Sequence, residues 1–157
     1  LRHADASIAG TAARVGAATR DLCEVIDPAA LAAAIAAIRK DRGLSCGPVR
    51  VAWQVPCSLE HGQRSSTAGK VEALLRAAGC ELVATHDPTL CCGSAGAYSI
   101  LQPELARELR TRKLDSLLGD QPAAIATANI GCLEHLRQAS AVPVRHWIEI
   151  VDSILFA

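Results

Sequence analysis

The sequence predicts an α/β fold in which a parallel sheet of about four strands has helices on both faces and is preceded by an N-terminal pair of helices. Two observations support this prediction. Short runs rich in β-branched residues alternate with longer segments of helical character after an all-helical start. Half of the 157 residues are hydrophobic, and this length is sufficient for one domain with a substantial core.

The N-terminal segment is expected to be helical. Apolar residues between positions 8 and 26 recur on one helical face. Asp27 followed by Pro28 is typical of an N-cap and a first turn, so a second helix is expected from there to about Arg42. We expect residues 1–45 to form a hairpin-like helical extension that packs on the remainder of the chain.

Strands and helices are expected to alternate through the rest of the sequence. The predicted strands cover residues 49–55, 80–85, 123–128 and 142–146. The predicted helices cover residues 65–78, 103–118 and 132–140, with a last one from about Trp147. Ser65, Ser66 and Thr67 are N-cap candidates for the first of these helices, and Gly79 is expected to end it.

Composition excludes several classes of function. The sixteen basic and sixteen acidic residues cancel, and the chain has two Trp, one Tyr and one Phe, so nucleic acid is not an expected partner. The longest apolar run, residues 29–38, is too short for a transmembrane segment, which needs about 20 residues. No signal-peptide pattern is present, and the chain starts at Leu1, so we expect a cytoplasmic fragment of a longer protein.

The cysteines indicate metal or redox chemistry. Seven cysteines, an odd number, in a chain without an export signal do not suggest a disulfide framework. Cys23 and Cys80 are expected to be small buried hydrophobes, and Cys46 a loop thiol. A vicinal disulfide between Cys91 and Cys92 would be strained and would leave the other cysteines unexplained.

Four cysteines are expected to meet at one edge of the sheet. Cys57 follows the first strand, Cys91 and Cys92 follow the second, and Cys132 opens the helix after the third. The carboxyl ends of parallel strands share an edge, where open α/β sheets place their sites. Thiolates are soft ligands that suit iron–sulfur clusters or zinc, and a helix N-terminus favours the ionised thiol. Backbone N–H groups are expected to approach the sulfurs at three glycines, Gly93, Gly96 and Gly131.

Three motifs carry a family resemblance. "PCSLEHGQ", "LCCGSAGAYSILQPELA" and "NIGCLEHL" resemble the cysteine-rich (CCG) domain near the C-terminus of the glycolate oxidase iron–sulfur subunit. The wider superfamily includes a cysteine-rich subunit of heterodisulfide reductase. The resemblance covers most of the chain and implies that residues 1–157 are a single cysteine-rich domain of a longer iron–sulfur subunit, without the ferredoxin-like motifs of such subunits.

The resemblance also implies an activity. The domain would be an electron-transfer module that takes electrons from flavin (FAD) subunits oxidising glycolate and passes them toward the respiratory chain. It would lie in the cytoplasm, with peripheral association at the inner face of the cell membrane through the complex. The isolated domain is not expected to catalyse a reaction, because no Ser-His-Asp or paired-carboxylate spacing is present.

The family pattern assigns metal ligation to the same four cysteines and implies a [4Fe–4S] cluster. In heterodisulfide reductase relatives a fifth cysteine, in a final C-x-x-C, contributes to a noncubane [4Fe–4S] cluster, and His135 stands at that position here. His135 lies one helical turn after Cys132 and is a candidate ligand. His61, within the family's "HGQ", is a candidate for contact with the cofactor.

Two alternatives remain. Four cysteines and a histidine also fit tetrahedral zinc, and the chain would then be a zinc-stapled structural or docking domain without a redox role. Thiol–disulfide chemistry is less favoured because the chain has no C-x-x-C motif.

Overall fold

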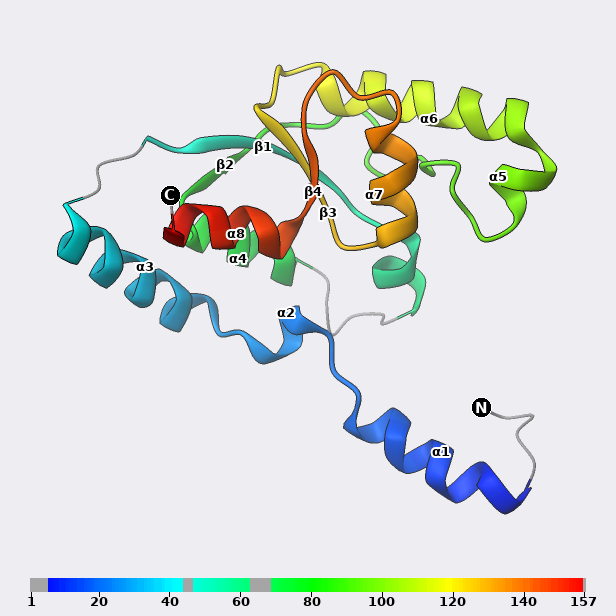
Figure 1. Cartoon of the computed structure of the whole chain (residues 1–157), viewed down its shortest axis with the longest axis horizontal. Coiled ribbons are helices and arrows are strands. Elements are labelled where there is room, and N and C mark those ends of the chain that lie inside the picture. Colours follow the sequence, from blue (N-terminus) through cyan, green and yellow to red (C-terminus); the bar gives the residue numbers. More distant parts are fainter. Residues whose placement is uncertain (1–5, 44–46, 63–68, 157) are drawn as a thin grey trace.

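A computed structural model describes residues 6–43, 47–62 and 69–156 of the chain. Its centre is one sheet of four parallel strands in the order β2-β1-β3-β4 (Figure 1). The strands are Val49–Gln54 (β1), Cys80–Leu82 (β2), Ala124–Thr127 (β3) and Val144–His146 (β4). The α/β prediction is confirmed, although β2 ends three residues earlier than expected.

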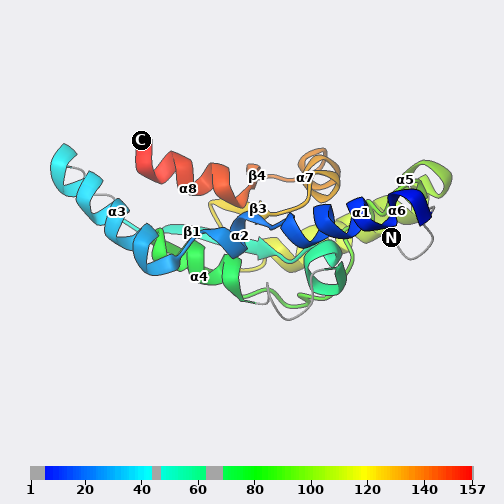
Figure 2. The same cartoon turned by 90° about the horizontal axis from the view of Figure 1, so that it is seen from below.

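Helices cover both faces of the sheet, as predicted (Figure 2). One face packs on Pro28–Arg42 (α3), Lys70–Ala77 (α4) and Trp147–Phe156 (α8). The other face packs on Pro103–Leu118 (α6) and Ile130–Arg137 (α7). Side chains of a strand alternate between the two cores: Val51 and Trp53 point to the α4 and α8 side, whereas Ala52 points to the α6 and α7 side.

The predicted N-terminal helix is interrupted. Residues Ala6–Ala18 (α1) and Leu22–Val25 (α2) are separate helices. Asp21 causes the break because it forms a capping box: its side chain accepts from the N–H of Cys23, and its own N–H donates to Glu24. An N-cap residue adopts an extended backbone, so a helix cannot continue through it.

The expected hairpin of N-terminal helices is therefore not formed. Asp27 caps α3 through the N–H of Ala30, as predicted, and α3 packs against α4 and α8. In contrast, α1 points away from the sheet, with Ile8 and Val15 exposed (Figure 1). The second predicted helix contributes Ile35 to the core, and the part of the first that forms α2 contributes Cys23.

Two short elements near the carboxyl edge of the sheet were not predicted. A π-helix, Ser58–Gly62 (η1), follows β1, and a single-turn helix, Tyr98–Leu101 (α5), precedes α6. The predicted caps at residues 65–67 and the loop thiol Cys46 lie outside the described residues. Within the described residues, no helix has the length and hydropathy needed to cross a bilayer.

Candidate metal centre

The four predicted cysteines line one pocket of about 150 Å³. Three loops form it, those that follow β1, β2 and β3, and they contribute Cys57, the pair Cys91–Cys92, and Cys132. The other lining residues are Pro56, Ser58, Ser94, Ala95, Gly96 and Asn129. The sulfurs are thus brought to a single edge of the sheet from positions far apart in the sequence.

The strand order explains why this edge is open. From β1 the chain crosses to β2 on one side, whereas β3 and β4 continue on the other side. Neighbouring strands whose connections leave in opposite directions form a switch point, where doubly wound sheets have a crevice. Cys57 follows β1 and Cys132 follows β3, so these two cysteines flank the switch point.

The sulfurs differ in depth. Cys92 and Cys132 are only 3% and 7% exposed, and their Sγ atoms are 2.9 Å apart. Both pack in the core between the sheet and helices α6 and α7. Cys91 is partly buried and Cys57 is exposed, so they form the outer rim of the pocket. The site therefore has a fixed inner pair and an outer pair that solvent or a partner can approach.

A hydrogen bond links the two thiols of the inner pair. The Cys132 thiol lies within hydrogen-bond reach of Cys92 and lowers the pKa of Cys92 to about 6, despite the burial of both groups. The same interaction raises the pKa of Cys132, and burial adds to this effect. Burial, followed by the charge of Cys91, raises the pKa of Cys57. Because metal ligands must be deprotonated, binding of a metal centre has to displace these protons.

Backbone geometry supports only part of the predicted role of the glycines. The N–H of Gly93 is 3.4 Å from Sγ of Cys91, as expected for a donor to a ligand sulfur. Gly96 lines the pocket with φ at +49°. The N–H of Gly131 instead donates to Oδ1 of Asn129 at 2.9 Å. Asn129 also accepts from the N–H of Cys132, and this N-cap holds Cys132 in the first turn of α7.

None of the histidines whose side chains are described lines the cysteine pocket. Nε2 of His135 is 3.1 Å from the carbonyl oxygen of Ala106 in α6. His135 lines a different hollow of about 210 Å³ with Arg110 and Gln138. The backbone of His61 lies in η1, but its side chain is outside the described parts of the chain.

The four sulfurs surround a space without being arranged about one point. In the part of the chain that the structure describes, no group of three or more His, Cys, Asp or Glu side chains has the arrangement of ligands to a metal ion. The structure thus brings the four sulfurs to one pocket but does not arrange them around a single metal position.

Three polar residues behind the pocket were not predicted. Lys113 of α6 is completely buried, and its Nζ donates to the carbonyl oxygens of Asp87 and Pro88, at 3.1 and 2.9 Å. Thr127 at the end of β3 donates to Gln54 at the end of β1 over 2.5 Å, and both are buried. The helical spacing could have indicated that Lys113 is buried. Lys113 lies seven residues after Ala106 and four before Leu117, so all three fall on the buried face of α6.

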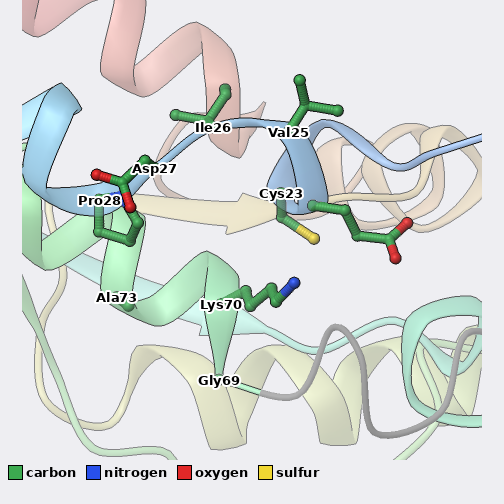
Figure 3. A pocket seen from close by; sticks show the side chains of 9 residues that line it. Cys23, Val25, Ile26, Asp27, Pro28, Gly69, Lys70 and Ala73 are labelled. Carbon is green, nitrogen blue, oxygen red and sulfur yellow. The ribbon is translucent and has the colours of Figure 1, made fainter.

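A larger hollow lies on the other face of the sheet. It has a volume of about 440 Å³ between α2 and α4, and the sulfur of Cys23 and the amine of Lys70 extend into the same space (Figure 3). Burial and then Asp21 raise the pKa of Cys23 to about 12. Burial also raises the pKa of Cys80 to about 11. These thiols are neutral and buried, which confirms their prediction as small hydrophobes.

Fold and site together define a doubly wound α/β domain with a four-cysteine pocket at its switch point. Residues 51–137 match the family "CCG: Cysteine-rich domain", and the chain belongs to this family.

Two relatives show a related sequence. The glycolate oxidase iron-sulfur subunit of Escherichia coli (strain K12) is 46% identical over 109 residues, which are 69% of this chain and 26% of that protein. The probable glycolate oxidase iron-sulfur subunit of Bacillus subtilis (strain 168) is 29% identical over 90 residues, 57% of this chain and 20% of that protein. The chain thus spans about a quarter or less of the length of these curated relatives, and the predicted resemblance is confirmed.

Proposed function

We propose that this chain is the iron–sulfur electron-transfer domain of a glycolate oxidase complex. In this proposal a [4Fe–4S] cluster is held by Cys57, Cys91, Cys92 and Cys132. The observation that carries the proposal is that these cysteines, from three loops, line one pocket at the switch point of the sheet. Both relatives are named as iron–sulfur subunits, which supports the choice of cofactor.

The residues of the pocket suit such a cofactor. A bound cluster would supply one-electron transfer, and thiolates are its usual ligands. The buried Cys92 and Cys132 would hold it from the inside of the pocket, and the exposed Cys57 would hold it from the side open to solvent. The N–H of Gly93 donates toward the sulfur of Cys91, an interaction that stabilises negative charge on a ligand. His135 is not in the proposed ligand set, because its Nε2 is engaged at Ala106.

The rest of the proposal concerns the parent protein. We propose that residues 1–157 are one cysteine-rich domain of a longer subunit in the cytoplasm. Flavin (FAD) subunits would oxidise glycolate and reduce this subunit, which would pass electrons toward the respiratory chain at the inner face of the cell membrane. The domain by itself would catalyse no reaction. The similarity to the Escherichia coli subunit supports this placement.

A zinc-stapled docking domain is the second candidate. The observation in its favour is the short separation of Cys92 and Cys132, whose sulfurs are 2.9 Å apart. Two thiolates on one zinc ion lie roughly 3.8 Å apart when each bond is about 2.3 Å, so these two sulfurs would have to separate by about 0.9 Å to bind one ion. The ligands of a cluster bind different irons and would have to separate further.

Metal analysis separates the two candidates. The chain is produced and purified without oxygen, and iron, acid-labile sulfide and zinc are measured. A cluster predicts iron and sulfide with broad visible absorption that bleaches on reduction. Each Cys→Ser change in the pocket is expected to reduce the iron content, whereas Cys23→Ala, on the other face of the sheet, is the matched control. Colourless protein with one zinc and no iron would contradict the cluster.

A further inference from the structure

Lys113 is a buried cation whose nearest partners are uncharged. Its side chain is 0% exposed within α6, and Nζ donates to the carbonyl oxygens of Asp87 and Pro88. None of the ion pairs formed among the described residues includes Lys113. Carbonyl oxygens satisfy the hydrogen bonds of an ammonium but do not neutralise its charge, and an isolated buried charge is costly.

The negative charge that faces Lys113 comes from Asp87 and from the cysteine site. Burial lowers the pKa of Lys113, while the charges of Asp87, Cys92, Cys132 and Cys57 raise it, in decreasing order of effect. Asp87 is exposed, and its carboxylate accepts a hydrogen bond from Oγ1 of Thr89. Solvent therefore screens the charge of this carboxylate. Cys92 and Cys132 are buried, so the negative charge that this pair carries is screened less.

The carbonyls bound by Lys113 belong to the segment that leads to the ligands. Asp87 and Pro88 precede the Cys91–Cys92 pair by only a few residues, after β2 has ended. The hydrogen bonds therefore tie this loop to α6. The same ammonium anchors the loop and interacts electrostatically with the cysteine site.

We propose that Lys113 is a positioning residue of the cysteine-bound centre, which anchors the loop of Cys91 and Cys92 and compensates the negative charge of the loaded site. This inference rests on the proposed function. Reduction adds one electron to a centre that already carries thiolate charge. A fixed cation nearby favours that electron by Coulomb attraction and raises the reduction potential of the centre.

Ser116 provides a matched comparison on the same helix. Its hydroxyl accepts from the N–H of Asp87 at 2.9 Å and lies 3.4 Å from the carbonyl oxygen of Asp87. It anchors the same segment without a charge. Ser116→Ala thus removes an anchor, whereas Lys113→Met removes an anchor and the buried charge.

The test compares the midpoint potentials of anaerobically purified wild type, Lys113→Met and Ser116→Ala, measured by redox titration with EPR or visible detection. Lys40→Met, at an exposed position near the end of α3, controls for loss of a lysine. At a fixed potential, Lys113→Met is expected to lower the ratio of reduced to oxidised centre about tenfold, or 59 mV for one electron. The two control variants should stay within about twofold of wild type.

An unchanged potential in Lys113→Met, or an equal shift in Ser116→Ala, would overturn the proposal. If Lys113→Met does not fold by circular dichroism, Lys113→Gln, which can still donate to a carbonyl, replaces it with the same expected outcomes. If wild type holds no iron, the proposed function fails, and Lys113 is tested separately by Cd²⁺ titration of the thiolate absorption. Binding in Lys113→Met is then expected to be about tenfold weaker than in Ser116→Ala, and equal affinities would refute the role of Lys113.

Discussion

Gly93→Ala is expected to destabilise the fold and displace the paired cysteines. Gly93 has φ at +88°, and a Cβ atom there would lie 2.5 Å from the carbonyl oxygen of Ala106 and 3.2 Å from Nε2 of His135. The left-handed backbone costs an alanine about 1–2 kcal/mol. The clash is with backbone of α6, which cannot rotate away, and crowding of this kind costs a further ~1–3 kcal/mol.

The sum is a loss of about 2–5 kcal/mol in the free energy of unfolding, and each kcal/mol lowers Tm by about 2–4 °C for a domain of this size. Gly96→Ala is the matched control in the same loop, since Gly96 has φ at +49° and a Cβ atom added there would meet no atom within 4 Å. Urea unfolding of the metal-free chain measures both variants. Equal losses in Gly93→Ala and Gly96→Ala would show that contact with α6 does not matter and would refute this reasoning.

Three further perturbations follow from the same structure. Asn129→Ala removes the cap of α7 and should lower the unfolding free energy by about 1 kcal/mol. The iron content of the same preparation should also fall, and an unchanged iron content would show that the cap does not position Cys132 for metal binding. Thr127→Val leaves Oε1 of Gln54 without its buried donor and should cost about 1–3 kcal/mol by urea unfolding, while an unchanged midpoint would contradict this. The pKa of Cys23, about 12, is raised from 9.0, so its contribution to stability is complete below pH 9 and is lost as pH rises toward 12. Cys23→Ala should therefore flatten the fall in Tm between pH 9 and 11, and an unchanged slope would count against the assignment.

Features that depend on local sequence were predicted well. The Asp27–Pro28 start of α3, the span of α6 and the start of α8 at Trp147 are all present as expected. Capping, proline geometry and apolar periodicity act over a few residues, so they can be recognised in a sequence. The break at Asp21 was missed because apolar spacing continues across it, whereas the capping box decides the backbone.

The functional side chains divide in the same way. Cys57 and Cys132 could be placed at one edge because each follows a strand, and parallel strands end together. His135 was placed on the helix face of Cys132 as a candidate ligand; its Nε2 lies 3.1 Å from the carbonyl oxygen of Ala106 in α6, and its ligation stays a prediction. Lys113 could not be linked to the site from sequence, because its partners are carbonyls about 25 residues away.

By itself, the sequence determined the alternation of strands and helices and the arrival of four cysteines at the ends of three strands. Only the tertiary structure decided that β1 lies beside β3, that Cys92 and Cys132 are buried while Cys57 is exposed, and that a lysine is enclosed behind them. The physical reason is range. Hydrogen bonds and backbone preferences that involve neighbouring residues can be recognised in the sequence. Strand order, burial and the electrostatic field at a cysteine sulfur depend on which distant parts of the chain pack together.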